Sequence, residues 1–81
     1  MNNICRDIFR AIHEGKWLQI EYRNRESQIT KYWIGIRSLN PQKRTLAVDG
    51  LHLGRYTTKS YEAIYIDSIL TSQIVEGSYQ P

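Results

Sequence analysis

Core-forming and polar side chains alternate along two neighbouring stretches of the chain, Trp17–Arg23 and Thr30–Ile36, and in both the even-numbered positions can face a core. A period of two is typical of a strand with one buried face. Pairing shifted by one residue would turn one strand's apolar side chains to solvent, so parity restricts how the two strands form a hairpin. The predicted pairs are Leu18 with Ile34, Ile20 with Tyr32 and Tyr22 with Thr30. They require a loop with an odd number of residues, either Arg25–Ser27 or Asn24–Gln28.

The same register accounts for the opposite face of the hairpin, which played no part in choosing it. It pairs Glu21 with Lys31, Gln19 with Trp33 and Trp17 with Gly35. Opposite charges attract in the first pair. In the last pair the tryptophan ring can cover the bare backbone of a strand glycine. We therefore expect one register to satisfy both faces.

Apolar residues recur at helical spacing in Asn3–Glu14 and predict a short amphipathic helix. The stripe consists of Ile4, Ile8, Ala11 and Ile12, widened by Cys5 and Phe9. Asn2 or Asn3 can cap its start, and Gly15 can end it in the left-handed conformation. A helix of about a dozen residues is marginal alone in water. We therefore expect this helix to dock on the sheet and close one end of it.

Turn dipeptides divide the middle of the chain. Asn-Pro and Asp-Gly both favour turns, so Ser38–Lys43 is predicted as a turn and Asp49-Gly50 as a turn, a bulge or the start of a loop. Between them, Arg44–Val48 is expected to be a strand with Leu46 and Val48 inward.

The last part of the chain alternates again in Glu62–Asp67, and its predicted core residues are Ile64, Ile66 and Ile69. Ile66–Ile69 is expected to bend or form a short helical link. A last strand around Ser72–Val75 and a tail over Gly77–Pro81 follow.

One helix and about five short strands in 81 residues predict a mainly β fold. Such strands suit a strongly bent antiparallel sheet closed as a small barrel. A chain of this length buries only ~60% of the surface that its unfolded form exposes, so residues 1–81 are expected to be one domain. Its parts are a helix packing on the barrel (1–15), the barrel (16–76) and the tail (77–81).

The net charge is +3, and the positive charge is concentrated around the hairpin. Between Lys16 and Arg44 seven basic residues outnumber two acidic ones, a balance of +5. From Leu51 onward two basic residues meet three acidic ones, a balance of −1. An anion or a nucleic acid would therefore be attracted to the hairpin side. The alternative is a strand face whose charges are simply solvated.

The sequence contains little that suggests catalysis. One cysteine and two histidines lack the paired spacing of a zinc site, and the five glycines form no phosphate-binding loop, so no metal, cofactor or enzymatic activity is expected. Cys5 is expected to be a small buried hydrophobe. No segment is long and apolar enough for a signal peptide or a membrane span, which predicts a cytoplasmic protein with no membrane partner.

The candidate binding residues are on the outward side of the hairpin. They are Arg23, Lys31, Trp33 and Arg37. Cations beside an exposed indole suit stacking on a base while contacting phosphate. The alternative is that Trp33 and Trp17 are buried against the helix, a neighbouring domain or a second copy of the chain, since an exposed surface with two tryptophans is unusual on a monomer.

Two segments resemble WYL domains. Ala11–Tyr22 is similar to the opening of the family, a short helix followed by a glycine and a strand with an "I-x-Y" end, and Ile64–Ile69 resembles its closing "F-x-L-D-R-I" pattern. Three positions depart from the family. Its Trp-Tyr-Leu run would fall on Arg44–Leu46, its closing arginine on Ser68 and an earlier arginine near Glu62.

The resemblance implies a Src-homology-3-like (Sm-like) barrel. It also implies a module that binds nucleic acid or a small anionic effector beside a larger helicase-, nuclease- or regulator-type partner. On this basis the chain is expected to be the N-terminal accessory or regulatory domain of a longer protein. The second hypothesis is a protein-interaction or assembly module. The two differ in salt dependence, because phosphate binding weakens steeply with ionic strength and aromatic burial does not.

Overall fold

The computed structural model describes residues 3–79. Its elements are α1 (Ile4–Glu14), β1 (Lys16–Arg23), β2 (Ile29–Asn40), β3 (Thr45–His52), β4 (Thr57–Tyr65), the 3-10 helix η1 (Ile66–Ser68) and β5 (Ile69–Ser78). The strands form one antiparallel sheet in the order β4-β3-β2-β1-β5. The predicted class, mainly β with one N-terminal helix and five antiparallel strands, is confirmed.

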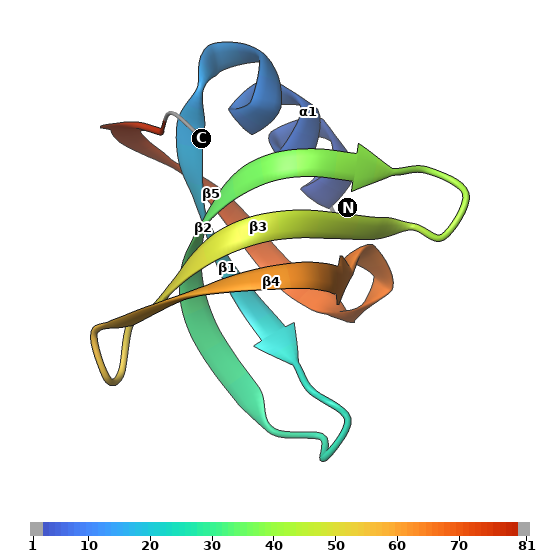
Figure 1. The fold of residues 1–81 in the computed structure, drawn as a ribbon, viewed down its shortest axis with the longest axis vertical. Coiled ribbons are helices and arrows are strands. Elements are labelled where there is room, and N and C mark those ends of the chain that lie inside the picture. The colour runs from blue at the N-terminus through green and yellow to red at the C-terminus, as the bar shows by residue number, and fades with distance from the viewer. Residues whose placement is uncertain (1–2, 80–81) are drawn as a thin grey trace.

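The sheet curls strongly, and α1 lies over one end of it (Figure 1). Strand pairing leaves β4 and β5 as its two edges within the part of the chain that the structure describes. η1 joins these edges through the chain itself, and the backbone N–H of Ile66 donates to the carbonyl of Arg44 at 3.0 Å. The bend at Ile66–Ser68 is the link that the sequence predicted.

The register of the hairpin is confirmed at every position of the inner face that the sequence paired. Leu18 lies opposite Ile34, Ile20 opposite Tyr32 and Tyr22 opposite Thr30. The outer pairs Gln19 with Trp33 and Glu21 with Lys31 are confirmed too. The loop is the longer of the two alternatives, Asn24–Gln28, because its end residues are hydrogen-bonded to each other through the backbone and side chain of Asn24. Its N–H donates to the Gln28 carbonyl, and its Oδ1 accepts from the N–H groups of Glu26 and Gln28, all at 2.9 Å.

The core lies between the inner face of the sheet and α1. Its fully buried members are Ile8, Leu18, Ile20, Ile34, Leu46 and Val48. From α1 only Ile4, Ile8 and Ala11 are buried, so the expected stripe is narrower: Cys5, Phe9 and Ile12 are exposed. Gly15 ends the helix in the left-handed conformation as expected, at φ 63°. Asn3 precedes α1 without a side-chain capping bond, and Asn2 lies outside the described residues.

One predicted turn is shorter than expected, and the other is absent. β2 continues to Asn40, because Ser38–Asn40 pair with Thr45–Ala47 after an irregularity in the register beside Arg37. Asp49 and Gly50 lie inside β3 rather than at a turn. The absence of a side chain at Gly50 leaves room for the ring of Tyr61 on the inner face, since a Cβ there would be 2.9 Å from a ring carbon.

The C-terminal region is more ordered than the predicted tail. β5 begins at Ile69 and continues through Gly77 to Ser78, and Tyr79 is only 8% exposed, while Gln80 and Pro81 lie outside the described residues. Ile64 and Ile69 are buried as predicted, and Ile66 is half-buried. The ring that covers Gly35 belongs to Tyr79, so the expected cover by Trp17 is wrong.

Candidate functional site

The outer face of the sheet carries both tryptophans, and each is held by a hydrogen bond. Trp33 is half-buried and donates from Nε1 to Oε1 of Gln19 at 3.0 Å. Trp17 donates from Nε1 to the carbonyl of Ser78 at 3.0 Å and packs edge-on against Tyr79, with ring centroids 4.8 Å apart. Both indoles therefore have structural partners within this domain.

Arg37 is surrounded by acceptors. Its guanidinium lies 3.5 Å from carboxylate oxygens of both Asp49 and Glu62 and donates to the carbonyl of Tyr61 at 3.3 Å. Only 31% of its side chain is exposed. Its charge is therefore already matched by two carboxylates of the same chain.

Asp49 connects Arg37 to Tyr79 on the outer face. Hydrogen bonds from the hydroxyls of Tyr79 (2.7 Å) and Ser60 (2.8 Å), followed by the charge of Arg37, lower the pKa of Asp49 below its usual value. Burial, followed by the bond to Asp49, raises the pKa of Tyr79 to about 12. These contacts fix the C-terminal residues across Gly35 and give this part of the face a structural role.

The structure does not bring all four predicted binding residues together. Arg23 lies opposite Ile29 at the start of β2, and Arg37 is eight residues further along the same strand. At ~3.3 Å per residue, the two positions are separated by up to about 26 Å of strand. Lys31, like Arg23, is exposed near the hairpin loop. The two ends of β2 are therefore different environments.

At the end of the molecule away from α1, the hairpin loop and the β3–β4 turn project from the sheet (Figure 1). We call this region the open end. The N–H of Leu53 donates to the carbonyl of Lys31 at 3.1 Å and attaches the β3–β4 turn to β2. Four exposed cations belong to the open end: Arg23, Arg25, Lys31 and Arg55. Arg25 and Arg55 entered the charge balances but were not predicted as binding residues, and the turn that carries Arg55 has no recognisable pattern in the sequence.

The four cations at the open end form no ion pair with residues 3–79, whereas Arg10, Lys16, Arg37 and Arg44 each form one. Arg6, Lys43 and Lys59 also have no ion pair in that range, but they do not belong to the open end. Glu21, which lies opposite Lys31, instead accepts a hydrogen bond from Thr71 at 2.9 Å. The positive charge of the open end is thus left for an external anion.

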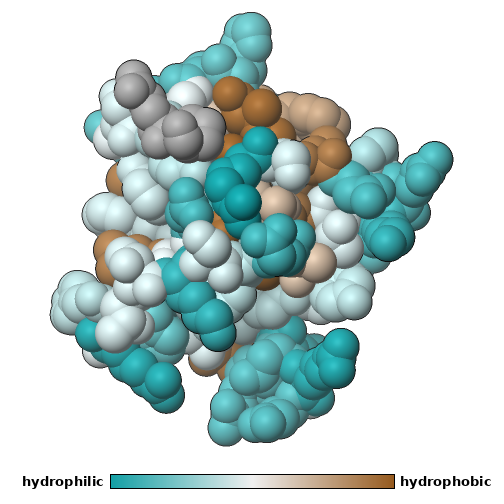
Figure 2. Space-filling view, in the orientation of Figure 1, coloured by the Kyte–Doolittle hydropathy of each residue, from teal (hydrophilic) through white to brown (hydrophobic). Residues whose placement is uncertain are grey.

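An apolar pocket of about 200 Å³ opens on the inner face of the sheet at this end. We call it the tyrosine pocket. Its rim is formed by Tyr22, Tyr32, Tyr61, Asn24 and Ala63, and its floor by Ile20, Ile34, Val48 and Ile64. A more open hollow of about 400 Å³ shares Tyr22, Asn24 and Ala63 with it and is also lined by Arg23 and Arg25. We call this second space the basic hollow. In Figure 2 the hydrophilic lobes at this end are separated by a notch.

The three rings of the tyrosine pocket are held in place from different directions. Tyr32 and Tyr61 meet edge to face, with centroids 5.9 Å apart. The hydroxyl of Tyr22 accepts the N–H of Tyr65 at 3.0 Å. Burial, followed by the neighbouring Tyr61, raises the pKa of Tyr32, while the charge of Arg55 opposes that shift. The parity of the strands predicted that Tyr22 and Tyr32 face the core. They do face inward, but both lie at its edge and are only partly buried, which parity could not predict.

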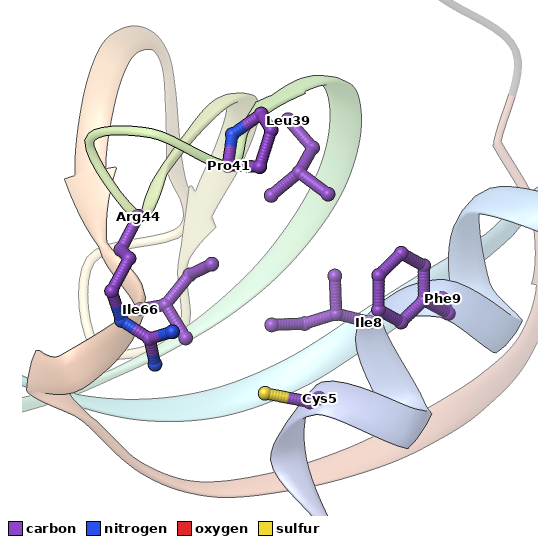
Figure 3. A pocket seen from close by; sticks show the side chains of 7 residues that line it. All are labelled: Cys5, Ile8, Phe9, Leu39, Pro41, Arg44 and Ile66. Carbon is purple, nitrogen blue, oxygen red and sulfur yellow. The ribbon is translucent and has the colours of Figure 1, made fainter.

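A third, smaller hollow of about 120 Å³ lies between α1 and the β2–β3 turn (Figure 3). We call it the helix groove. It is lined by Cys5, Ile8, Phe9, Leu39, Pro41, Arg44 and Ile66. Phe9 is 60% exposed beside it, and Ile12 on the same helix is 42% exposed. Arg44 is ion-paired with Asp67 at 2.9 Å, so this groove is apolar with a neutralised rim.

Residues 3–79 contain no group of three or more His, Cys, Asp or Glu side chains placed to hold a metal ion. None of the helical segments described in that range has the length and apolar character needed to cross a bilayer. Comparisons of the chain with protein-family models, with curated proteins and with solved structures gave no match. The resemblance to WYL domains therefore stays a prediction.

Proposed function

We propose that this domain is a non-catalytic binding module for nucleic acid or an anionic effector. The observation that supports this function best is the group of four cations at the open end that have no acidic partner among residues 3–79. Charges left unpaired on one side of a small protein attract phosphate and other anions. The proposed contact residues are Arg23 and Lys31 from the sequence prediction, joined by Arg25 and Arg55.

The fold is consistent with the family that the sequence resembles. We propose that the curled sheet is a WYL-like, Sm-like barrel, closed near η1 by side-chain contact. The hydroxyl of Tyr22 on β1 accepts the N–H of Tyr65 at the end of β4. This hydrogen bond connects two strands that are not neighbours in the sheet. In that family such a barrel would serve as the accessory or regulatory domain of a larger helicase- or regulator-type protein.

The test is the salt dependence of binding to a short fluorescent single-stranded oligonucleotide, followed by anisotropy. Removing one phosphate contact lowers the slope of log K against log salt by ~0.7. Arg23→Ala, Lys31→Ala and Arg55→Ala should each show this decrease. Arg10→Ala changes the net charge equally but removes an exposed cation already paired with Glu14, so its slope should match the parent. Failure of the parent chain to bind the oligonucleotide at low salt would refute nucleic acid as the ligand.

Arg37→Ala provides a more demanding comparison. Because Asp49 and Glu62 already neutralise Arg37, its removal should leave the salt slope unchanged. A decrease equal to that of Lys31→Ala would move the binding surface back to the full outward side of β2, where the sequence alone had placed it.

The second candidate function is a protein-interaction or assembly module, and exposed apolar side chains on α1 favour it. In its sequence-based form the tryptophan face is buried against a partner domain or a second copy. The exposure of Phe9 in the helix groove, and of Ile12 on the same helix, moves that surface to α1. Sedimentation velocity of the parent and of Phe9→Ser tests it: self-association that is insensitive to salt and lost in the variant would support this alternative.

A further inference from the structure

The tyrosine pocket is an aromatic site beside cations that have no ion pair in the described part of the chain, and this combination restricts its ligand more closely than charge alone. Two of its tyrosines, Tyr22 and Tyr32, come from the hairpin, and Tyr61 comes from β4. All three are only partly buried. Their rings therefore still present aromatic surface to an incoming group, unlike the fully buried side chains on the pocket floor.

The volume of the pocket limits how much of a ligand can enter. At about 200 Å³ it is smaller than the ~300 to 1,000 Å³ of sites that enclose a whole drug-sized molecule. One flat ring system fits such a space, with the remainder of the ligand outside. Aromatic side chains bind flat heterocycles by stacking, which every nucleobase can do.

The polar groups of the rim suit the edge of such a ring. The Tyr22 hydroxyl accepts the N–H of Tyr65, which leaves its own proton to donate. Asn24 is held by the loop, since its Oδ1 accepts two backbone N–H groups. The rim is thus shaped before any ligand arrives, and preorganisation reduces the cost of binding.

Positive charge flanks the pocket on both sides. Arg23 and Arg25 line the basic hollow, which is continuous with the pocket through Tyr22, Asn24 and Ala63. On the other side, the ammonium of Lys59 lies 5.6 Å from the centroid of Tyr61. A purely apolar ligand would not use these cations, and an inorganic anion would not use the rings.

We infer that the tyrosine pocket binds one nucleobase while the adjoining phosphate lies in the basic hollow beside Arg23 and Arg25. This inference rests on the proposed function and specifies its ligand as a phosphorylated nucleoside. The nucleoside comes either from a free nucleotide or from an unpaired position of a single strand. Base and phosphate are recognised by neighbouring parts of one site.

The experiment compares a short single-stranded oligonucleotide with an abasic strand of the same length, using the full 81-residue chain. The base-containing strand should bind about 5- to 150-fold more tightly, which corresponds to the ~1 to 3 kcal/mol of one stacked base. Equal binding of both strands, with steep salt dependence, would overturn the inference while leaving the proposed function intact. Absence of binding by either strand and by adenosine monophosphate would overturn both.

Two variants connect the preference for bases to this pocket. Tyr61→Ala removes a ring, and Ala63→Leu fills the pocket from an exposed position without removing one. Each should reduce the ratio between the two strands towards one. Tyr56→Ala is the control, since this tyrosine is 78% exposed and lies on the neighbouring turn. A ratio that survives in Ala63→Leu, with the fold intact by circular dichroism, would contradict the assignment.

Mononucleotides distinguish the two sources of the base. Adenosine monophosphate, adenosine and inorganic phosphate are titrated separately and followed by amide chemical shifts. Shifts at Tyr61 and Arg23 with the monophosphate, and much weaker binding of adenosine and of phosphate, would indicate a free nucleotide as the ligand. Binding of the base-containing strand without binding of the monophosphate would indicate a single strand. Adenosine and its monophosphate binding equally would refute the role of the basic hollow.

Discussion

The molecule uses the same local device on both faces of its sheet, a tyrosine ring lying over a strand glycine, with opposite outcomes. On the outer face Tyr79 covers Gly35 and is 8% exposed. On the inner face Tyr61 lies against Gly50 but is only partly buried, at the rim of a pocket. The first ring is fixed by Asp49 and Trp17, whereas the second is bordered by the ammonium of Lys59.

This difference separates a structural site from a binding site. On the outer face Arg37, Asp49 and the N–H groups of both indoles already have partners in the same chain, so an external ligand would have to break those contacts. The open end has cations without such partners and aromatic surface that is still accessible. The presence of aromatic and basic residues therefore does not by itself identify a ligand-binding site. The contacts that these side chains already make within the chain decide which of them are available to a ligand.

The largest expected difference between the two tyrosines is in stability. Tyr79→Ala removes a buried aromatic side chain and should lower the free energy of unfolding by ~3 to 5 kcal/mol. Tyr61→Ala should cost clearly less, because its ring is partly solvated and borders a space that is already open. Urea denaturation of both variants measures this, and equal losses would show that Tyr61 is as structural as Tyr79.

Substitution of the glycine beneath each ring should follow the same order, with a larger loss of stability at Gly35 than at Gly50. At Gly35 an added Cβ would overlap the ring of Tyr79, which is held against the sheet, so Gly35→Ala should cost ~1 to 3 kcal/mol through overpacking. The emission of Trp17, which touches that ring, should shift as well. In Gly50→Ala the ring of Tyr61 can turn into the pocket, so denaturation should detect a smaller loss. A larger loss at Gly50 would reverse the comparison.

Alkaline pH should destabilise the fold through Tyr79 on the outer face. The pKa of Tyr79 is raised from 10.0 to about 12, so between these values the unfolded chain releases this proton while the folded chain keeps it. Stability from this group is therefore fully present below pH 10 and is lost as the pH rises towards 12. Tyr79→Phe should show a shallower alkaline decline in thermal stability than the parent. Identical declines would mean that the hydroxyl is solvated.

The smallest expected effect concerns Trp33. Gln19→Ala removes the acceptor of its indole N–H and should cost ~0.5 to 1.5 kcal/mol, as for one ordinary hydrogen bond. The tryptophan emission should move to longer wavelength as the ring gains contact with water. Gln73→Ala, opposite Gln19 on β5 and exposed, is the matched control. No change in either variant would leave Trp33 available for a ligand after all.

Much of the fold could be predicted from the chain, and the candidate site only in part. Period-two alternation and parity gave the pairing of Leu18 with Ile34 and of Gln19 with Trp33, since these depend only on neighbouring positions in two strands. The Asp49-Gly50 dipeptide was misleading because the glycine is there to admit a distant ring. Arg23 and Lys31 form no ion pair with residues 3–79, whereas Arg37 is ion-paired.

The sequence by itself determined the helix, its termination at Gly15, the register of the hairpin and the concentration of positive charge around it. These follow from local conformational preferences and from the spacing of apolar residues. Only the tertiary structure decided which charges are neutralised and which rings are covered. Arg37 meets Glu62 across 25 positions of sequence, and Tyr79 meets Asp49 across 30. Such contacts depend on how the sheet curls in space, which no periodicity of the chain encodes.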